Sequence, residues 1–193
     1  GVAGGASAAT RLRRLDERAE IILFEKGPYV SYANCGLPYY IGGVIAEKEK
    51  LLVTKPELLR RRFCIDVRTE NEVTAIDRAA KKVTVRDLRT NRTYEESYDK
   101  LLLSPGAAPK RLPVEGNDLE GVFTLRTVPD TLAIDAYIRE KRVKQAVVVG
   151  AGFIGVEMAE NLKKRGLDVT IVEFLDQAVG SLDREMAAVL HGH

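Results

Sequence analysis

The feature that most constrains the fold is a glycine-rich turn, Gly150-Ala151-Gly152-Phe153-Ile154-Gly155, which lies before a helical pattern. The apolar run 145–149 precedes the turn, and a second apolar run, 168–172, follows the helix and ends on Glu173. In a βαβ unit of this kind the glycines let the backbone approach a pyrophosphate, and the terminal acid accepts hydrogen bonds from a ribose. The complete pattern therefore predicts a dinucleotide-binding unit in an α/β fold.

Glu173 indicates which dinucleotide this unit prefers. It lies 18 residues after Gly155, where a carboxylate accepts from ribose hydroxyls and repels a 2′-phosphate. We therefore expect NADH to be favoured over NADPH, and we keep both as candidates because an Arg or Lys elsewhere can override the carboxylate. The residues expected at this cofactor are Gly150, Gly152, Phe153, Ile154, Gly155 and Glu173.

An incomplete copy of the same pattern begins the chain. Glycines and small residues at 1–9 lead into a helical stretch, and the strand predicted at 19–24 ends on Glu25, 20 residues after Gly5. The first glycine of the fingerprint would precede this chain, and Val2 stands where the second usually sits. We expect a leading β-strand to be missing, and we interpret the segment as another dinucleotide-binding unit.

A thiol lies between the two units. Cys35 sits in a polar, aromatic segment, 31–43, that Gly and Pro residues punctuate. A Cys in the first turn of a short helix is favoured as the thiolate, the form that attacks a disulfide or a peroxide. The alternative is a small buried hydrophobe, against which Asn34 and three neighbouring tyrosines argue. Cys64, in contrast, is expected to be buried on an apolar-alternating strand.

The other segments predict further elements and a domain boundary. Short strands joined by polar turns predict a β-meander at 64–67, 71–77, 82–87 and 92–98. We then expect a buried strand that ends in a small-residue turn at 98–107, a connector at 107–130, and a helix at 131–142 capped by Asp130. The domains predicted from this order are 1–112 and 113–193.

Composition excludes several functional classes. The 193 residues are 45% hydrophobic with a formal net charge of +2, which argues against disorder and against nucleic acid as the main partner. No apolar run approaches the roughly 20 residues that span a bilayer, so we expect no membrane association. Two cysteines without disulfide spacing or a signal peptide indicate a cytoplasmic protein. His191 and His193 have no acid or thiol near them in sequence, and we expect no metal site.

Together, the two glycine turns and the thiol segment Ser31-Tyr32-Ala33-Asn34-Cys35-Gly36-Leu37-Pro38-Tyr39-Tyr40 resemble the FAD-dependent pyridine nucleotide–disulfide oxidoreductases. The likeness covers essentially all of the chain, but half or less of a typical member. It implies a Rossmann-like FAD-binding domain with a β-meander insertion, followed by a Rossmann-like NAD(P)H-binding domain, each incomplete here. By this resemblance the residues at FAD are Ala3, Gly4, Ser7, Glu25, Lys26, Val73, Ser104 and Gly106.

The thiol segment is most similar to the single-cysteine branch of this family, which includes the coenzyme A-disulfide reductases. Members with a C-x₄-C pair have a second cysteine, whereas here position 40 is Tyr and position 30 is Val. The resemblance implies that Cys35, with Asn34 beside it, acts on coenzyme A disulfide or on a CoA persulfide or polysulfide. It also implies a homodimer built through downstream segments, and in some members a rhodanese domain.

Two alternatives stay open at this point. One is an NADH oxidase or peroxidase in which Cys35 cycles through a sulfenic acid. The other is a nucleotide-binding module without catalysis, in which oxidation of Cys35 is a signal.

Overall fold

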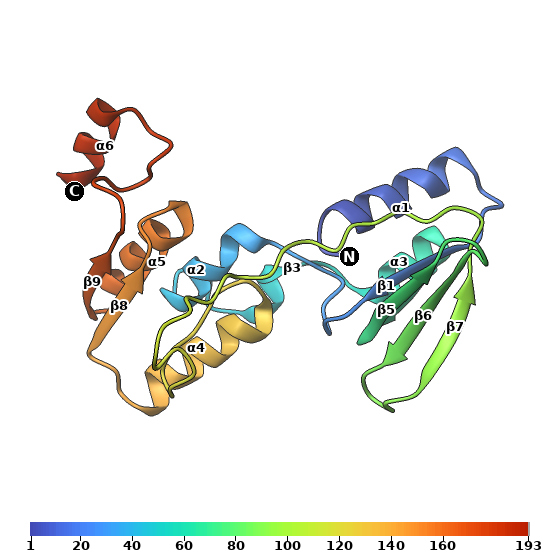
Figure 1. Ribbon diagram of the computed structural model, residues 1–193, viewed down its shortest axis with the longest axis horizontal. Helices are drawn as coiled ribbons and strands as arrows, with labels where there is room; N and C mark the ends of the chain where they lie inside the picture. The colour runs from blue at the N-terminus through green and yellow to red at the C-terminus, as the bar shows by residue number, and fades with distance from the viewer. Residues whose placement is uncertain (193) are drawn as a thin grey trace. The chain divides into compact units, whose positions relative to one another are not determined.

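The computed structural model describes residues 1–192, which form a mixed α/β chain of two compact units (Figure 1). One unit comprises residues 1–33 and 52–107, and the other comprises residues 34–51 together with the chain from 108 onward. The predicted α/β class is confirmed. The domain boundary between 112 and 113 stays a prediction, and His193 lies outside the described residues.

The first unit is built on a parallel strand pair. Strands β1 (Ile21–Glu25) and β4 (Ile65–Thr69) run side by side, and helices α1 (Gly4–Leu15) and α3 (Pro56–Phe63) pack against them (Figure 1). Small side chains let α1 approach the strands closely, since Ala6 and Ala9 are its buried residues. The core of this unit comprises Ala6, Ala9, Ile21, Leu23, Val30, Leu59, Ile65 and Val67.

An antiparallel meander extends the same unit and contains three of the four strands predicted for it. The prediction is wrong for the strand at 64–67, because that segment forms β4, which pairs in parallel with β1. The strands of the meander are β5 (Asn71–Asp77), β6 (Lys82–Asp87) and β7 (Thr93–Ser97), in that order. A smaller antiparallel pair joins β2 (Ser31–Tyr32) to β3 (Leu52–Thr54), which follows the 3₁₀ turn η2 (Lys48–Leu51).

The second unit brings the thiol segment together with the second glycine turn. The segment forms a 3₁₀ turn, η1 (Asn34–Gly36), and a short helix, α2 (Leu37–Ile41). Helix α2 packs on α4 (Val128–Glu140) and α5 (Phe153–Lys164), and α5 in turn packs on the parallel strands β8 (Gln145–Val149) and β9 (Asp168–Val172). Helix α6 (Arg184–His191) follows. The core of this unit comprises Ile41, Ile134, Ile138, Met158, Leu162 and Leu167.

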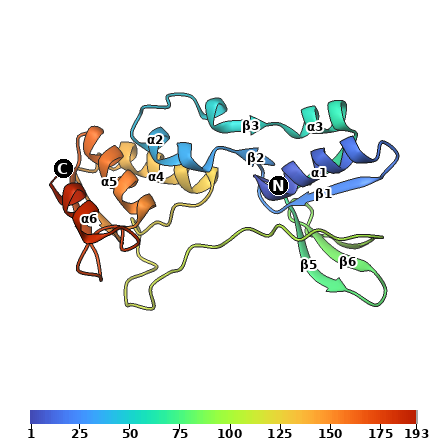
Figure 2. The ribbon, with the colours of Figure 1, turned by 90° about the horizontal axis from the view of Figure 1, so that it is seen from above.

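The prediction of a strand at 98–107 is wrong. Residues 98–107 contain no helix or strand, and they begin a long connection to α4 (Figure 2). Leu102 and Leu103 are 61% and 67% exposed. A strand needs a neighbour for its backbone N–H and C=O groups, and within residues 1–192 no strand pairs with this segment.

Two further predictions need correction. The helix predicted at 131–142 begins earlier, because Thr127 is its N-cap and Asp130 is the third helical residue of a capping box. Cys64 is exposed, and it ends α3 in a left-handed conformation (φ 48°) instead of lying within a strand. Its backbone N–H is bonded to the last carbonyls of that helix, which places it before β4 begins.

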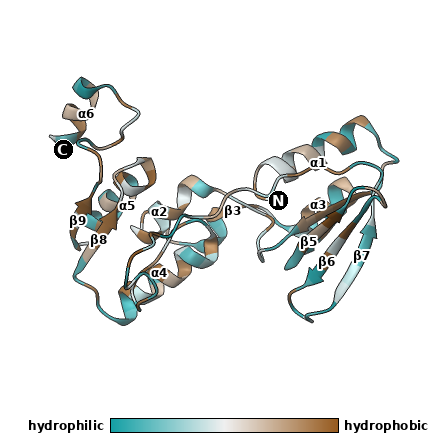
Figure 3. Cartoon of the chain, viewed as in Figure 1, coloured by the Kyte–Doolittle hydropathy of each residue, from teal (hydrophilic) through white to brown (hydrophobic). Residues whose placement is uncertain are grey.

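Apolar side chains are not confined to the two cores. Figure 3 shows hydrophobic colouring along β8 and β9, where Val147 and Val149 are more than 60% exposed. Within residues 1–192, no helix combines the length and the apolar character needed to cross a membrane.

Ile41→Ala tests how strongly α2 is held in the second unit. The Ile41 side chain is fully buried, so its truncation in the full-length protein should lower the free energy of unfolding by about 2–5 kcal/mol. Urea denaturation measures the change. Val44→Ala, at an exposed position just after α2, should leave stability within about 0.5 kcal/mol of the parent, and equal losses for the two variants would contradict the assignment.

Candidate nucleotide and thiol sites

The second glycine turn leaves the start of α5 open. Gly152 is the N-cap of α5, and no side chain caps the helix, so its first N–H groups are available to an anion. A Cβ added at Gly150 or Gly152 would meet no atom within 4 Å. A Cβ at Gly155 would collide with the Gly150 carbonyl oxygen, so a glycine there allows the helix to touch the turn.

Glu173 is fixed at the end of β9 by backbone N–H groups. Its Oε1 accepts from the N–H of Phe174 at 2.8 Å and of Leu175 at 2.9 Å. Its Oε2 accepts from the N–H of Ala151, inside the glycine turn. These bonds, from Leu175 first and then Ala151, lower the pKa of the Glu173 carboxyl from its ordinary value. The carboxylate is therefore ionised at neutral pH.

The first glycine turn repeats this arrangement. Helix α1 also begins without a side-chain cap. Glu25 Oε2 forms an ion pair of 2.7 Å with the N-terminal ammonium of Gly1, and Glu25 Oε1 accepts from the N–H of Gly27 at 2.8 Å. Gly1 and Ala151 occupy the same place in the two turns, four residues before Gly5 and Gly155. The sequence pattern assigns each acid a ribose contact only, and it misses the bond that each makes to its own turn.

The structure also brings Ser104 next to the start of α1. Its Oγ lies 3.2 Å from the position that a Cβ on Gly4 would take, which places the predicted residues Ala3, Gly4 and Ser104 together. Gly106, two residues on, has a φ of 72°, which suits glycine. Ser7 is an exposed residue in the second turn of α1.

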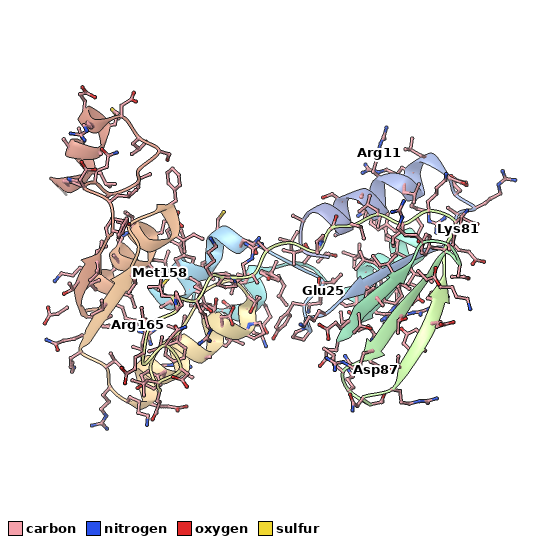
Figure 4. The ribbon with its side chains drawn as sticks, in the orientation of Figure 1. Arg11, Glu25, Lys81, Asp87, Met158 and Arg165 are labelled. Carbon is pink, nitrogen blue, oxygen red and sulfur yellow. The ribbon has the colours of Figure 1, made fainter. Side chains whose placement is uncertain are left out.

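Two salt bridges to Glu72 lie near the predicted residues Lys26 and Val73, and Lys26 itself forms one of them. Lys26 Nζ lies 2.7 Å from Glu72 Oε1, and Arg86 lies 2.7 Å from Glu72 Oε2. Hydrogen bonds from Lys26 first and then Arg86 lower the pKa of the Glu72 carboxyl. Lys26 directly follows Glu25, the last residue of β1, which Figure 4 labels, and Val73 follows Glu72 on β5.

In the thiol segment an exposed Cys35 precedes a short helix whose apolar side chains are buried. Cys35 lies in η1 and is exposed, whereas Leu37 and Ile41 of the following helix are buried. The Oδ1 atom of Asn34 is also buried, and it has no hydrogen-bond partner among residues 1–192. A buried acceptor without a partner is costly, so this amide is suited to a ligand that donates to it.

Cys35, Asn34 and the second glycine turn belong to one unit, and the first glycine turn with Ser104 belongs to the other. The structure therefore divides the predicted residues into two groups. Within residues 1–192, no group of three or more His, Cys, Asp or Glu side chains has the arrangement of a metal site.

Comparisons with known proteins agree with this arrangement of turns and thiol. A protein-family model described as "Pyridine nucleotide-disulphide oxidoreductase" matches residues 1–193. A coenzyme A disulfide reductase from Staphylococcus haemolyticus is 45% identical over 189 residues, which are 98% of this chain and 42% of the relative. The chain thus spans less than half the length of this relative.

Two solved structures are similar over the whole chain. The reduced CoADR-RHD of Bacillus anthracis is 54% identical with a TM-score of 0.98, and the match covers 100% of this chain and 35% of that one. A NAD-dependent persulfide reductase from A. fulgidus is 40% identical with a TM-score of 0.95, and the match covers 100% and 36% of the two chains.

The hydrogen bonds to Glu173 predict a pH-dependent effect of Glu173→Gln. The folded-state pKa of Glu173 is lowered, so its stabilising contribution is present above the unfolded pKa of about 4.3 and is lost as pH falls through the folded value. In the full-length protein the variant should be less stable than the parent at pH 7, and the difference should shrink below about pH 4. Urea denaturation across this range measures it, and a difference independent of pH would contradict the assignment.

Proposed function

Because the chain belongs to the pyridine nucleotide-disulphide oxidoreductase family, we propose that it is part of an FAD-dependent enzyme that reduces coenzyme A disulfide, or a CoA persulfide or polysulfide, with NAD(P)H. The exposed Cys35 thiol is the observation that carries the proposal. It lies on an anchored turn, and residues 31–43 contain no second cysteine. Such a thiol can pair with an external thiol but not with a partner in its own loop.

The first unit has the donor set that FAD requires. The uncapped start of α1, with its small residues, offers backbone N–H groups to a pyrophosphate. Ala3, Gly4 and Ser7 would line this site, Glu25 would accept from the adenosine ribose, and Ser104 and Gly106 would approach the flavin portion. Val73 and Lys26 would lie on the adenine side.

The second unit fits a nicotinamide dinucleotide in the same way. The start of α5 at Gly150, Gly152, Phe153, Ile154 and Gly155 would hold the pyrophosphate. Glu173 is ionised and points at its own turn, so it would accept from ribose hydroxyls and repel a 2′-phosphate. We therefore propose NADH as the preferred donor, with NADPH as the alternative.

The overall reaction is CoA–S–S–CoA + NAD(P)H + H⁺ → 2 CoA–SH + NAD(P)⁺. Bound FAD would supply the two-electron relay between the dinucleotide and the thiol. The Cys35 thiolate attacks one sulfur of the substrate, so that a Cys35–S–S–CoA bond forms and one CoA thiolate leaves. Two electrons then cleave this bond, which restores the Cys35 thiolate and releases the second CoA. The Asn34 side chain, with its unpartnered Oδ1, would orient a donor group of the bound substrate.

The proposal extends to the whole protein. We propose a cytoplasmic homodimer whose remaining segments complete the site, with an FAD domain at 1–112 and an NAD(P)H domain at 113–193. The small-molecule disulfide or persulfide is its substrate, in keeping with the names of the coenzyme A disulfide reductase and persulfide reductase relatives.

Cys35→Ser tests the central step. In the full-length flavoprotein it should lower kcat for CoA-disulfide reduction by about 10³-fold or more, because loss of a nucleophile removes the reacting atom. NADH-dependent reduction of an artificial acceptor such as ferricyanide should stay within about twofold of the parent. Cys64→Ser is the matched control, since Cys64 is the other exposed thiol, and it should behave as the parent does.

The same preparation separates the alternatives. Steady-state assays compare CoA disulfide, CoA persulfide, hydrogen peroxide and oxygen as acceptors, and a preference for peroxide or oxygen would support the sulfenic acid chemistry instead. Turnover with none of the four, or the absence of oxidised-flavin absorbance bands in the full-length protein, would overturn the proposal.

Glu173→Ala tests the nicotinamide preference. Removing the carboxylate takes away a ribose acceptor and a repulsive charge, so kcat/KM with NADH should fall about tenfold, as expected for one lost hydrogen bond to a charged group. The value with NADPH should rise. Steady-state kinetics with each donor measures both changes, and an unaltered NADH-to-NADPH ratio would remove Glu173 from the cofactor site.

A further inference from the structure

Arg165 joins the thiol segment to α4. It is the C-cap residue of α5, and its side chain is only 18% exposed. One guanidinium nitrogen, Nη1, donates to the Ile41 carbonyl oxygen and to Asp135 Oδ1, each at 2.7 Å. The Ile41 carbonyl belongs to the last residue of α2, so it lacks a helical partner. Arg165 satisfies this carbonyl while its charge is balanced by Asp135 on α4.

Asp135 is engaged on both oxygens. It is 8% exposed, and its Oδ2 lies 2.7 Å from Arg139, an exposed residue one turn along α4. Arg139 contacts the same carboxylate as Arg165, but among residues 1–192 it forms no hydrogen bond to α2. The two arginines therefore differ chiefly in whether they reach the thiol segment. Figure 4 labels Arg165 on α5, together with the buried Met158.

A second residue of α5 touches the same end of α2. Asn161, four residues before Arg165 and so on the same helix face, is 0% exposed. Its side chain lies so close to Gly42 that a Cβ on Gly42 would collide with Asn161 Oδ1. Gly42 has a φ of −71°, which any residue adopts. Glycine at this position is therefore explained by the close approach of α5 and not by backbone conformation.

These contacts fix the position of the thiol turn. Ile41 inserts its side chain into the core formed by α4 and α5. Arg165 binds the Ile41 carbonyl, and Asn161 packs closely against Gly42. Cys35 lies six residues before Ile41 on a continuous helical path through η1 and α2. A short helix of five residues is not stable by itself, so its orientation depends on this anchor.

We propose that Arg165, held by Asp135, is a positioning residue that fixes the Cys35 turn on the unit that carries the second glycine turn. Loss of the Arg165 bond leaves the Ile41 carbonyl without a donor and lets the end of α2 separate from α5. The thiol then samples more positions, which exposes it further to small reagents and places it less often in the geometry for reaction. The catalytic part of this inference rests on the proposed function, whereas the effect on thiol reactivity does not.

The test measures alkylation of Cys35 by iodoacetamide in the full-length, FAD-containing protein. The parent carries Cys64→Ser, so that Cys35 is the cysteine of residues 1–192 that reacts, and mass spectrometry follows its modification. Arg165→Met should raise the alkylation rate about fivefold, because local opening of an anchored segment becomes more frequent. It should lower kcat for disulfide reduction by about ten- to hundredfold, with KM for NADH unchanged. Arg165→Lys keeps a donor and a charge, so it should recover most of both values.

Arg139→Met is the matched control. It removes a cation from the same carboxylate without touching α2, so its alkylation rate and kcat should stay within about twofold of the parent. If Arg165→Met does not yield folded protein, Gly42→Ala supplies the same loosening by pushing α2 away from Asn161, and it should raise alkylation in the same direction.

Alkylation at the parent rate in the Arg165 and Gly42 variants would overturn the inference, and so would equal effects of Arg139→Met and Arg165→Met. Failure of the proposed function is recognised separately, because the parent would then show no turnover with CoA disulfide or CoA persulfide, or Cys35→Ser would retain that turnover. In that event the alkylation rates still report whether Arg165 positions the thiol.

Discussion

A carboxylate at the end of a strand, held against a backbone nitrogen of the glycine turn before it, is the contact on which the local structure of each glycine turn depends. Glu25 makes this contact to Gly1, and Glu173 makes it to Ala151. Each contact joins the strand that ends on the acid to the glycine turn, so that strand, turn and following helix are linked. The other oxygen of each carboxylate accepts from nearby backbone N–H groups.

The helices that follow the two glycine turns begin without side-chain caps. A serine or aspartate at the N-cap of α1 or α5 would satisfy the first N–H groups and occupy the space above them. The chain instead uses Ala3 and Gly152 there, whereas α4, which opens no glycine turn, has a complete capping box at Thr127. An uncapped start is not peculiar to the glycine turns, since α3 and α6 also begin without a side-chain cap. The glycine turns themselves, which leave the backbone N–H groups accessible, are what suit the starts of α1 and α5 to an anion.

The elements with strong local signals were predictable from the sequence. Strands β5, β6, β8 and β9 lie where alternating or apolar runs end at polar turns. The strand predicted at 98–107 failed because an apolar run becomes a strand only beside a partner. Cys64 was misplaced for a local reason: the end of α3 needs a residue whose N–H closes the last turn, and this need overrides the apolar alternation that follows.

The site was predictable in its residue types but not in its grouping. Spacing alone indicated the two turns, their acids and the exposed thiol segment, yet nothing near Cys35 in sequence indicates that its helix is anchored more than a hundred residues away. That anchor is a matter of packing: a buried Ile41, a Gly42 without a side chain and an Arg165 carrying a compensated charge. None of these residues belongs to a recognisable motif in the sequence, and their role becomes visible only in the packing of α2 against α5. Under the proposed function, the thiol needs a fixed position relative to the reacting groups, and long-range packing of this kind supplies it.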